Sequence, residues 1–273
     1  MQRALPFLLA TLPLVGEPAT GKSGYSLANP TPAALLRELS TDRPDVTESP
    51  FTVDAGHAQL EMDFTNFTHN RLDGTRTAAW GVAPFNLRLG LLSNFEAGLF
   101  VSPYTRLAEV PRGGPRTTHS GFGDVTLRAK FNFFGNDGGE SALGLIADLT
   151  LPTAASGLGS DKAEGALILP VAFEFADGWE GGAMTVAELR HRETGGYKVA
   201  WTNSATFGHD LAKNLSGYAE LTSTVGDGAP VATFDVGVAW KLDVSTQLDC
   251  GTKFGLTRSA DDLLVFAGIS RRF

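Results

Sequence analysis

From His57 to the C-terminus, apolar and polar residues alternate with a period of two. In the stretch GDVTLRAKFNFF, apolar side chains occupy every second position from Val125 to Phe133, and three of the five residues that alternate with them are charged. Such alternation predicts β-strands with one apolar face and one hydrated face. The pattern recurs in HAQLEMDF, FNLRLGL, FEAGLFV, ALGLIADLTL, ALILPVAFEF, TFDVGVAWKL, QLDCGTKFG and VFAGISRRF.

The predicted strands are long. Three less regular ones are expected at residues 179–190, 197–210 and 214–226, where the alternation does not decide which face is apolar. With these the chain is expected to hold about twelve strands, most of about 10 to 14 residues. A strand that crosses a bilayer needs about 9 to 11 residues, whereas strands of globular proteins average about 5 or 6.

The connections between the predicted strands alternate in length. Short ones (LSN, GNDGGE, ADG, DLAK and DVS) follow every second strand, and longer ones are expected at residues 104–120 and 152–163. An even strand number with short turns at one end is typical of outer-membrane barrels. The fold class we expect is therefore all-β, a transmembrane antiparallel up-and-down barrel.

A soluble β-sandwich or closed barrel would show the same alternation, because it too has one dry and one wet face. Strand length favours the membrane barrel. The terminal Phe273 also favours it, since Phe273 is in phase with the apolar residues Ala267 and Ile269. In that phase its ring would lie at the lipid interface, where aromatic girdles are found.

The N-terminal part lacks this alternation. Residues 1–20 carry one Arg followed by an apolar run, which predicts a signal peptide. Residues 21–56 are expected to form a periplasmic segment or a plug in the lumen, with about two helical turns at 31–39, and residues 57–273 are expected to form the barrel.

The hydrated faces supply candidate lumen-lining residues of both charge signs. One interpretation is a polar channel that selects solutes, and the other is a narrow barrel filled by ion pairs. Asp42, Arg43 and Asp45 are expected to form a turn in which Arg43 pairs locally. The lumen candidates are Glu61, Asp63, Arg88, Asp124, Arg128, Lys130, Asp148, Asp235, Lys241, Asp249 and Lys253.

Composition narrows the function further. The net charge of −8 argues against a nucleic-acid partner, and the single Cys250 excludes an intrachain disulfide and a Cys-based metal site. We expect no cofactor, no metal and no catalytic residue, because phosphate-cradling and G-x-S-x-G motifs are missing from the sequence. A hydrolase using Ser120 and His119 remains an alternative.

Three stretches resemble a known family. They are TDRPDVTESPFTVDAGHAQLEMDF at residues 41–64, GFGDVTLRAKF at 121–131, and the closing segment with D-x-G-x-x-x-G-L at 249–256 and G-I-S-x-R-F at 268–273. Together they are similar to the outer-membrane transporter-like family named for a meta-pathway of phenol degradation.

The resemblance implies a bacterial outer-membrane barrel for passive uptake of small solutes, with hydrophobic or aromatic ones suggested by the family name alone. A closed structural or adhesive barrel is the alternative. The partners expected are outer-membrane lipid and lipopolysaccharide, the barrel-assembly machinery acting on the strand that ends at Phe273, and a small-molecule solute of unknown identity.

Overall fold

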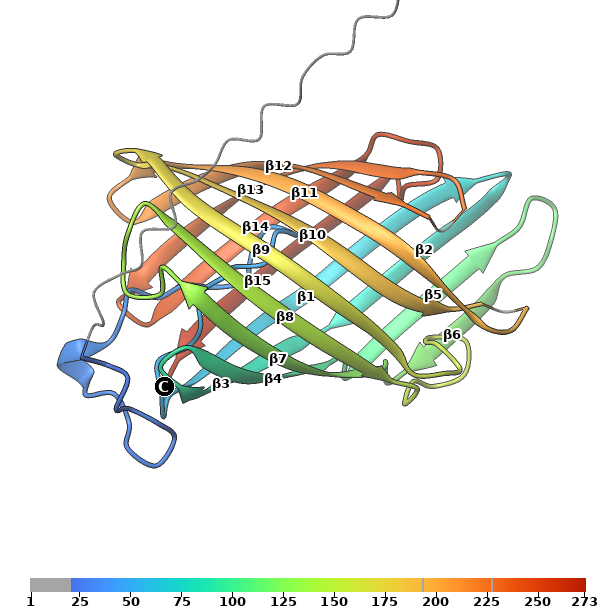
Figure 1. Cartoon of the computed structure of the whole chain (residues 1–273). Coiled ribbons are helices and arrows are strands. Elements are labelled where there is room, and N and C mark those ends of the chain that lie inside the picture. Colours follow the sequence, from blue (N-terminus) through green and yellow to red (C-terminus); the bar gives the residue numbers. More distant parts are fainter. Residues whose placement is uncertain (1–20, 193, 227) are drawn as a thin grey trace, which may run out of the picture.

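The strands form one antiparallel sheet that closes on itself. The computed structural model describes residues 21–192, 194–226 and 228–273. Each barrel strand pairs with its neighbours in sequence, and β1 (Ala58–Leu72) closes the ring by pairing with β15 (Leu263–Arg272) (Figure 1). The predicted signal peptide lies outside the described residues.

Three consecutive barrel strands are each broken in two. β1 pairs with β2 over its C-terminal part and with β3 over its N-terminal part, so β2 and β3 are one barrel strand interrupted at Ala83 and Pro84. Proline has no N–H to donate to a ladder, which explains this break and a second one at Pro103. The six segments are β2 (Thr75–Val82), β3 (Phe85–Leu92), β4 (Phe95–Val101), β5 (Tyr104–Val110), β6 (Thr117–Gly121) and β7 (Val125–Phe134).

The other strands are continuous. They are β8 (Ser141–Leu151), β9 (Glu164–Ala176), β10 (Trp179–His191), β11 (Tyr197–Ala212), β12 (Leu215–Val225), β13 (Val231–Asp243) and β14 (Thr246–Gly255). Within the described ranges, fifteen segments thus build a closed barrel of twelve strands. The predicted fold class and strand number are confirmed.

The two ends of the barrel differ. Connections at the end where β1 begins and β15 finishes, which we name the turn end, are two residues long except the one at 135–140. At the opposite loop end they are longer, except the two-residue turn at 73–74 between β1 and β2. The expected long loop at 104–120 is wrong, because β5 and β6 extend the barrel there and leave only 111–116 as the connection. The loop at 152–163 is present, and the Asp124 carboxylate holds it by accepting the backbone N–H groups of Thr153, Ala154 and Ser160.

The apolar positions of the alternating pattern face outward. Leucines exposed along the middle of the barrel include Leu87, Leu127, Leu149 and Leu167. In β10, β11 and β12, where the alternation did not decide which face is apolar, Leu189, Phe207 and Leu221 are exposed. Aromatic side chains are exposed towards both ends, as in membrane barrels: Phe133, Phe175, Trp179, Trp240 and Phe273 near the turn end, and Trp80, Tyr104, Tyr197, Trp201 and Phe254 near the loop end.

The helix expected at 31–39 is wrong. Only the 3₁₀ turn η1 (Ala33–Leu35) forms, and Leu36 is already extended. The backbone N–H of Arg37, which an α-helix would direct to the carbonyl of Ala33, donates instead to Asp54 Oδ2 at 3.0 Å. A tertiary contact therefore outweighs the local propensity. Within the described residues, no helix combines the length and the apolar content needed to cross a bilayer.

The outward leucines generate a stability prediction. Leu169, on the exposed face of β9 and 42% exposed, should face lipid. We expect Leu169→Arg to lower the free energy of unfolding in a phospholipid bilayer by about 2–4 kcal/mol, because a charge near the bilayer midplane must be desolvated. Val244→Arg, in a turn and 83% exposed, is the matched control and should cost about 0–1 kcal/mol. Equal effects in urea titrations would contradict a lipid-facing exterior.

Candidate functional site

Residues 37–54, which we name the plug, enter the barrel and return to the same end. Arg37 at its start donates to the Ser93 carbonyl in one of the short turns at 2.7 Å. At its other end, the Thr52 N–H donates to Asn136 Oδ1 in the next short turn at 3.0 Å. Both limbs are thus held at the turn end, and the apex at residues 43–48 reaches into the lumen (Figure 1).

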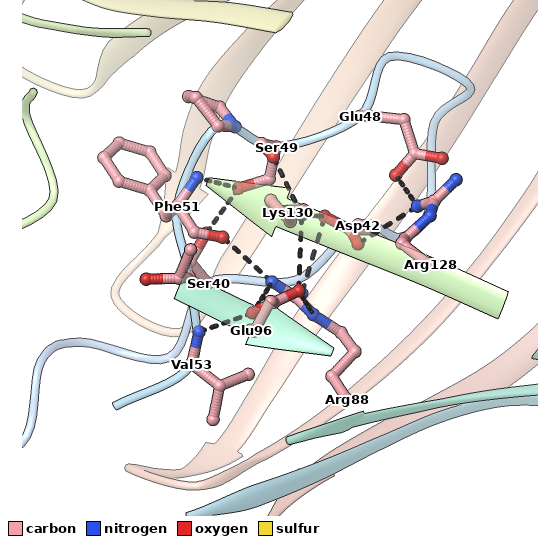
Figure 2. Close-up of polar contacts among 12 residues, drawn as sticks. Ser40, Asp42, Glu48, Ser49, Phe51, Val53, Arg88, Glu96, Arg128 and Lys130 are labelled. Atoms are coloured by element: carbon pink, nitrogen blue, oxygen red, sulfur yellow. Dashed lines mark hydrogen bonds and ion pairs between the residues drawn. The ribbon is translucent and has the colours of Figure 1, made fainter. Parts of the chain in front are cut away.

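A carboxylate of the plug sits among three cations of the barrel wall. Asp42 contacts Lys130 Nζ at 2.5 Å, Arg88 Nη1 at 3.4 Å and Arg128 Nη1 at 3.6 Å (Figure 2). Arg88 comes from β3, and the other two come from β7. One negative charge of the plug therefore links two segments of the wall.

Each of these cations also has a partner in the wall itself. Arg88, fully buried, contacts Glu61 at 2.6 Å and Glu96 at 2.8 Å, and it also donates to the Phe51 carbonyl of the plug. Glu96 also accepts the N–H of Val53 at 2.7 Å. A buried charge is tolerated only when paired and hydrogen-bonded in this way.

Arg128, the second arginine that contacts Asp42, is also paired with carboxylates of the wall and of the plug. Its guanidinium binds both carboxylate oxygens of Asp148 on β8 at 2.8 Å, the bidentate geometry in which such pairs are strongest. It also donates to Glu48 of the plug at 2.7 Å and lies 4.5 Å from the centre of the Phe100 ring. The plug therefore adds two carboxylates, Asp42 and Glu48, around the wall pair formed by Arg128 and Asp148.

Arg43 makes the second attachment of the plug. It does not pair locally, as expected from the sequence, but reaches across to Asp249 on β14 at 2.5 Å and to Asp63 on β1. The expectation is wrong because the adjacent carboxylate is already occupied: Asp42 points to the three wall cations.

The apex makes the third attachment. Glu220 on β12 accepts hydrogen bonds from the backbone N–H groups of Val46 and Thr47 at 2.8 and 2.7 Å. Val46 also packs against the buried apolar side chains Ile146, Ile168, Met184 and Val186, which face the lumen from β8, β9 and β10. This is the apolar part of an otherwise polar docking site.

Most predicted lumen candidates lie inside the barrel in contact with the plug or with one another. In addition to the pairs already described, Lys241 contacts Glu38 at 2.5 Å and Lys253 contacts Asp235 at 3.3 Å. Asp124 differs, since it precedes β7 and binds the loop at 152–163. Sequence reasoning missed Glu96, which the alternation in FEAGLFV places inward, and Glu220, which lies in a strand of undecided phase.

The hydrolase pair has an unsuitable geometry. His119 and Ser120 are consecutive residues of β6. Successive side chains of a strand point to opposite faces, so the hydroxyl and the imidazole cannot form the hydrogen bond that a nucleophile and its base require.

Asp45 at the apex carries a titratable carboxyl in a crowded site. Burial, followed by the nearby carboxylates of Glu220 and Glu180, raises the pKa of Asp45 to about 8. An ordinary Asp has a pKa of about 3.9, so at neutral pH the docked plug keeps a proton that a hydrated plug would already have released.

The comparisons with known proteins agree with this geometry. The sequence profile of the family described as "Putative MetA-pathway of phenol degradation" matches residues 41–273. The chain belongs to this family. The MetA-pathway match begins at the plug and includes every strand of the barrel. A search of curated proteins finds no match.

Among solved structures, an outer membrane channel from Pseudomonas putida F1 is similar, with a TM-score of 0.63 and 14% identity over 86% of this chain and 100% of that one. The beta domain of the Bordetella autotransporter BrkA has a TM-score of 0.53 and 14% identity, over 80% of this chain and 99% of that one. These likenesses establish the barrel fold that this MetA-pathway member shares with both.

The charge cluster generates a stability prediction. Asp42→Asn keeps the shape of the side chain but leaves three wall cations without the shared negative charge. We expect the free energy of unfolding to fall by about 1.5–3 kcal/mol, the usual range for a lost hydrogen bond to a charged group, because Arg88 and Arg128 keep their wall carboxylates. Glu38→Gln, which breaks the exposed pair with Lys241, is the control and should cost less than about 1 kcal/mol. Equal midpoints in denaturant titrations of Asp42→Asn and the native chain would refute the cluster's role.

The raised pKa of Asp45 generates a pH prediction. Since the docked carboxyl holds its proton up to a pH of about 8, its contribution to plug docking is complete below the ordinary Asp pKa of about 3.9 and is lost as the pH rises towards 8. The free energy of unfolding should therefore decrease between about pH 4 and pH 8, and Asp45→Asn should make that decrease smaller. An unchanged pH profile in that variant would assign the titration to another group.

Proposed function

We propose that this protein is an outer-membrane channel for passive uptake of small solutes, closed at rest by the plug. The observation that carries the proposal is the set of ion pairs between the plug and the wall. Family membership and the likeness to the outer membrane channel from Pseudomonas putida F1 support it. The apolar exterior with aromatic residues near both ends supports the location.

The two wall arginines next to Asp42 have wall partners that do not depend on the plug. Arg88 retains Glu61 and Glu96, and Arg128 retains Asp148. Removal of the plug therefore need not leave these arginines uncompensated, and water can enter to hydrate them. A plug attached by hydrogen bonds and ion pairs can exchange those contacts for water at modest net cost, unlike a fully apolar core. This property supports a movable plug over a permanent filling.

We infer that the turn end faces the periplasm, since outer-membrane barrels have short periplasmic turns. The plug would then close the barrel from the periplasmic side. Lipid and lipopolysaccharide would contact the outer face, and the strand ending at Phe273 would be the one recognised during assembly. The proposed solutes include hydrophobic or aromatic molecules, for which the family description is the support.

The test is the conductance of the full refolded chain in planar bilayers. We expect rare or small current steps for the native chain and a severalfold higher open probability for Asp42→Asn, because the central attachment is weakened. Glu38→Gln should behave like the native chain. Swelling of proteoliposomes in solutions of a small sugar would extend the measurement to solutes.

A mobility shift between unheated and heated samples on a gel would establish that each variant is folded. If folded Asp42→Asn passes no more current than the native chain, and neither supports swelling, the channel proposal is refuted and a closed structural barrel is favoured.

A further inference from the structure

A cavity of about 180 Å³ lies between the plug apex and the inner wall of β1, β13, β14 and β15. Its walls combine charged groups with apolar surface. The residues that matter for its chemistry are Arg43, Pro44 and Val46 from the plug, and Asp235, Lys253 and Phe266 from the wall. An engineered apolar cavity of about 150 Å³ accommodates benzene, so this space is large enough for a single ring with a short substituent.

The polar side of the cavity has an excess of negative charge. Glu220 and Asp235 stand directly opposite each other in the register of β12 and β13, on the face that points inward. Like charges in that relation repel. Asp63 on β1 also lines the cavity and adds a third carboxylate to the region.

The nearby cations do not balance these three carboxyls. Lys253 contacts Asp235 at 3.3 Å. Arg43 is committed to Asp63 and Asp249, one carboxylate for each side of its guanidinium. The region therefore remains negative after the existing pairs are counted, which favours an incoming cation over an anion.

One oxygen of Asp235 has no partner. The residue is 2% exposed, and its Oδ1 accepts no hydrogen bond from the residues that the structure describes. A buried acceptor left unsatisfied is costly, so a donor supplied by a ligand would be bound favourably. Because Asp235 lines the cavity, a molecule seated there can supply that donor.

The opposite side of the cavity is apolar. Pro44 and Val46 from the plug line it together with Leu264 and Phe266 from β15. Phe266 already attracts one cation, since the Arg43 guanidinium lies 5.5 Å from its ring centre. The two sides together match a molecule with an ammonium group at one end and a hydrocarbon ring at the other.

We propose that this cavity binds a small organic cation, with its ammonium on the Asp235 carboxylate and its apolar body against Phe266, Leu264 and Pro44. This site deepens the proposed function by naming a class of solute, and it rests on that function only for the step of transport. Binding at the site requires neither an open plug nor a membrane.

The test is isothermal titration calorimetry on the full chain refolded in detergent at neutral pH, with 2-phenylethylammonium chloride as the probe. We expect saturable binding of the ammonium, affinity for neutral 2-phenylethanol at least tenfold lower, and no binding of phenylacetate. Asp235→Asn should weaken the ammonium by at least tenfold, since it replaces a charged acceptor with a neutral amide. Asp73→Asn, in an exposed pair with Arg258, is the matched control and should bind as the native chain does.

The outcomes separate the two proposals. If the alcohol binds as tightly as the ammonium, or Asp235→Asn binds as tightly as the native chain, the cation site is refuted whatever the conductance. Current without ammonium binding would refute the site and leave the channel intact. Ammonium binding without current in any variant would refute the channel and support the site. An unfolded Asp235→Asn variant, detected by its gel mobility, would be replaced by Asp235→Ser, with the same expectation.

Discussion

The pairing of buried charge inside a narrow barrel is the constraint on which the rest of the structure depends. Arg88 and Lys130 have no exposed surface, and both project from strands whose opposite face is apolar. Cations in such a place must be matched by carboxylates and by hydrogen-bond acceptors. The wall supplies part of the match through Glu96 and Glu61, and Asp42 of the plug supplies the remainder.

This arrangement explains why an ordinary composition can build a barrel without a conventional core. The outward side chains have their apolar environment outside the molecule, and the inward ones are held by polar contacts to a segment of the same chain. The apolar contact of Val46 with Ile146 and Met184 is local, so docking is directed mainly by charge geometry. We infer that the main role of this polar network is to fix the position of the plug.

Much of the barrel could be predicted from the sequence, because alternation with a period of two indicates both where a strand runs and which of its faces points outward. Leu127 and Phe133 are outward and Arg128 and Lys130 inward, as the alternation requires. The same rule would have found Glu96. The breaks at Pro84 and Pro103 were less visible, and the second concealed the continuation of the strand into β5. The docking partners of the plug could not be predicted, because they depend on which distant strands become neighbours. Nothing local in TDRPD indicates that Arg43 binds Asp249 rather than an adjacent carboxylate.

The phase of β10 was hidden for a related reason. Met184 and Val186 are apolar yet face inward, where the plug and the neighbouring strands cover them. Apolar and polar residues alternate where a strand separates lipid from water. Where the plug fills the lumen, inward positions can also be apolar, and the alternation no longer shows which face is outward.

The position of the plug partners along the chain has a consequence for biogenesis. Arg43 is separated from Asp249 by 206 residues, and Val46 from Glu220 by 174. Contacts of such long range form late, because the intervening chain must be ordered first. Docking at the apex cannot be completed until β12 and β14 have joined the sheet. Full docking of the plug is therefore expected to be a late event in the assembly of the barrel.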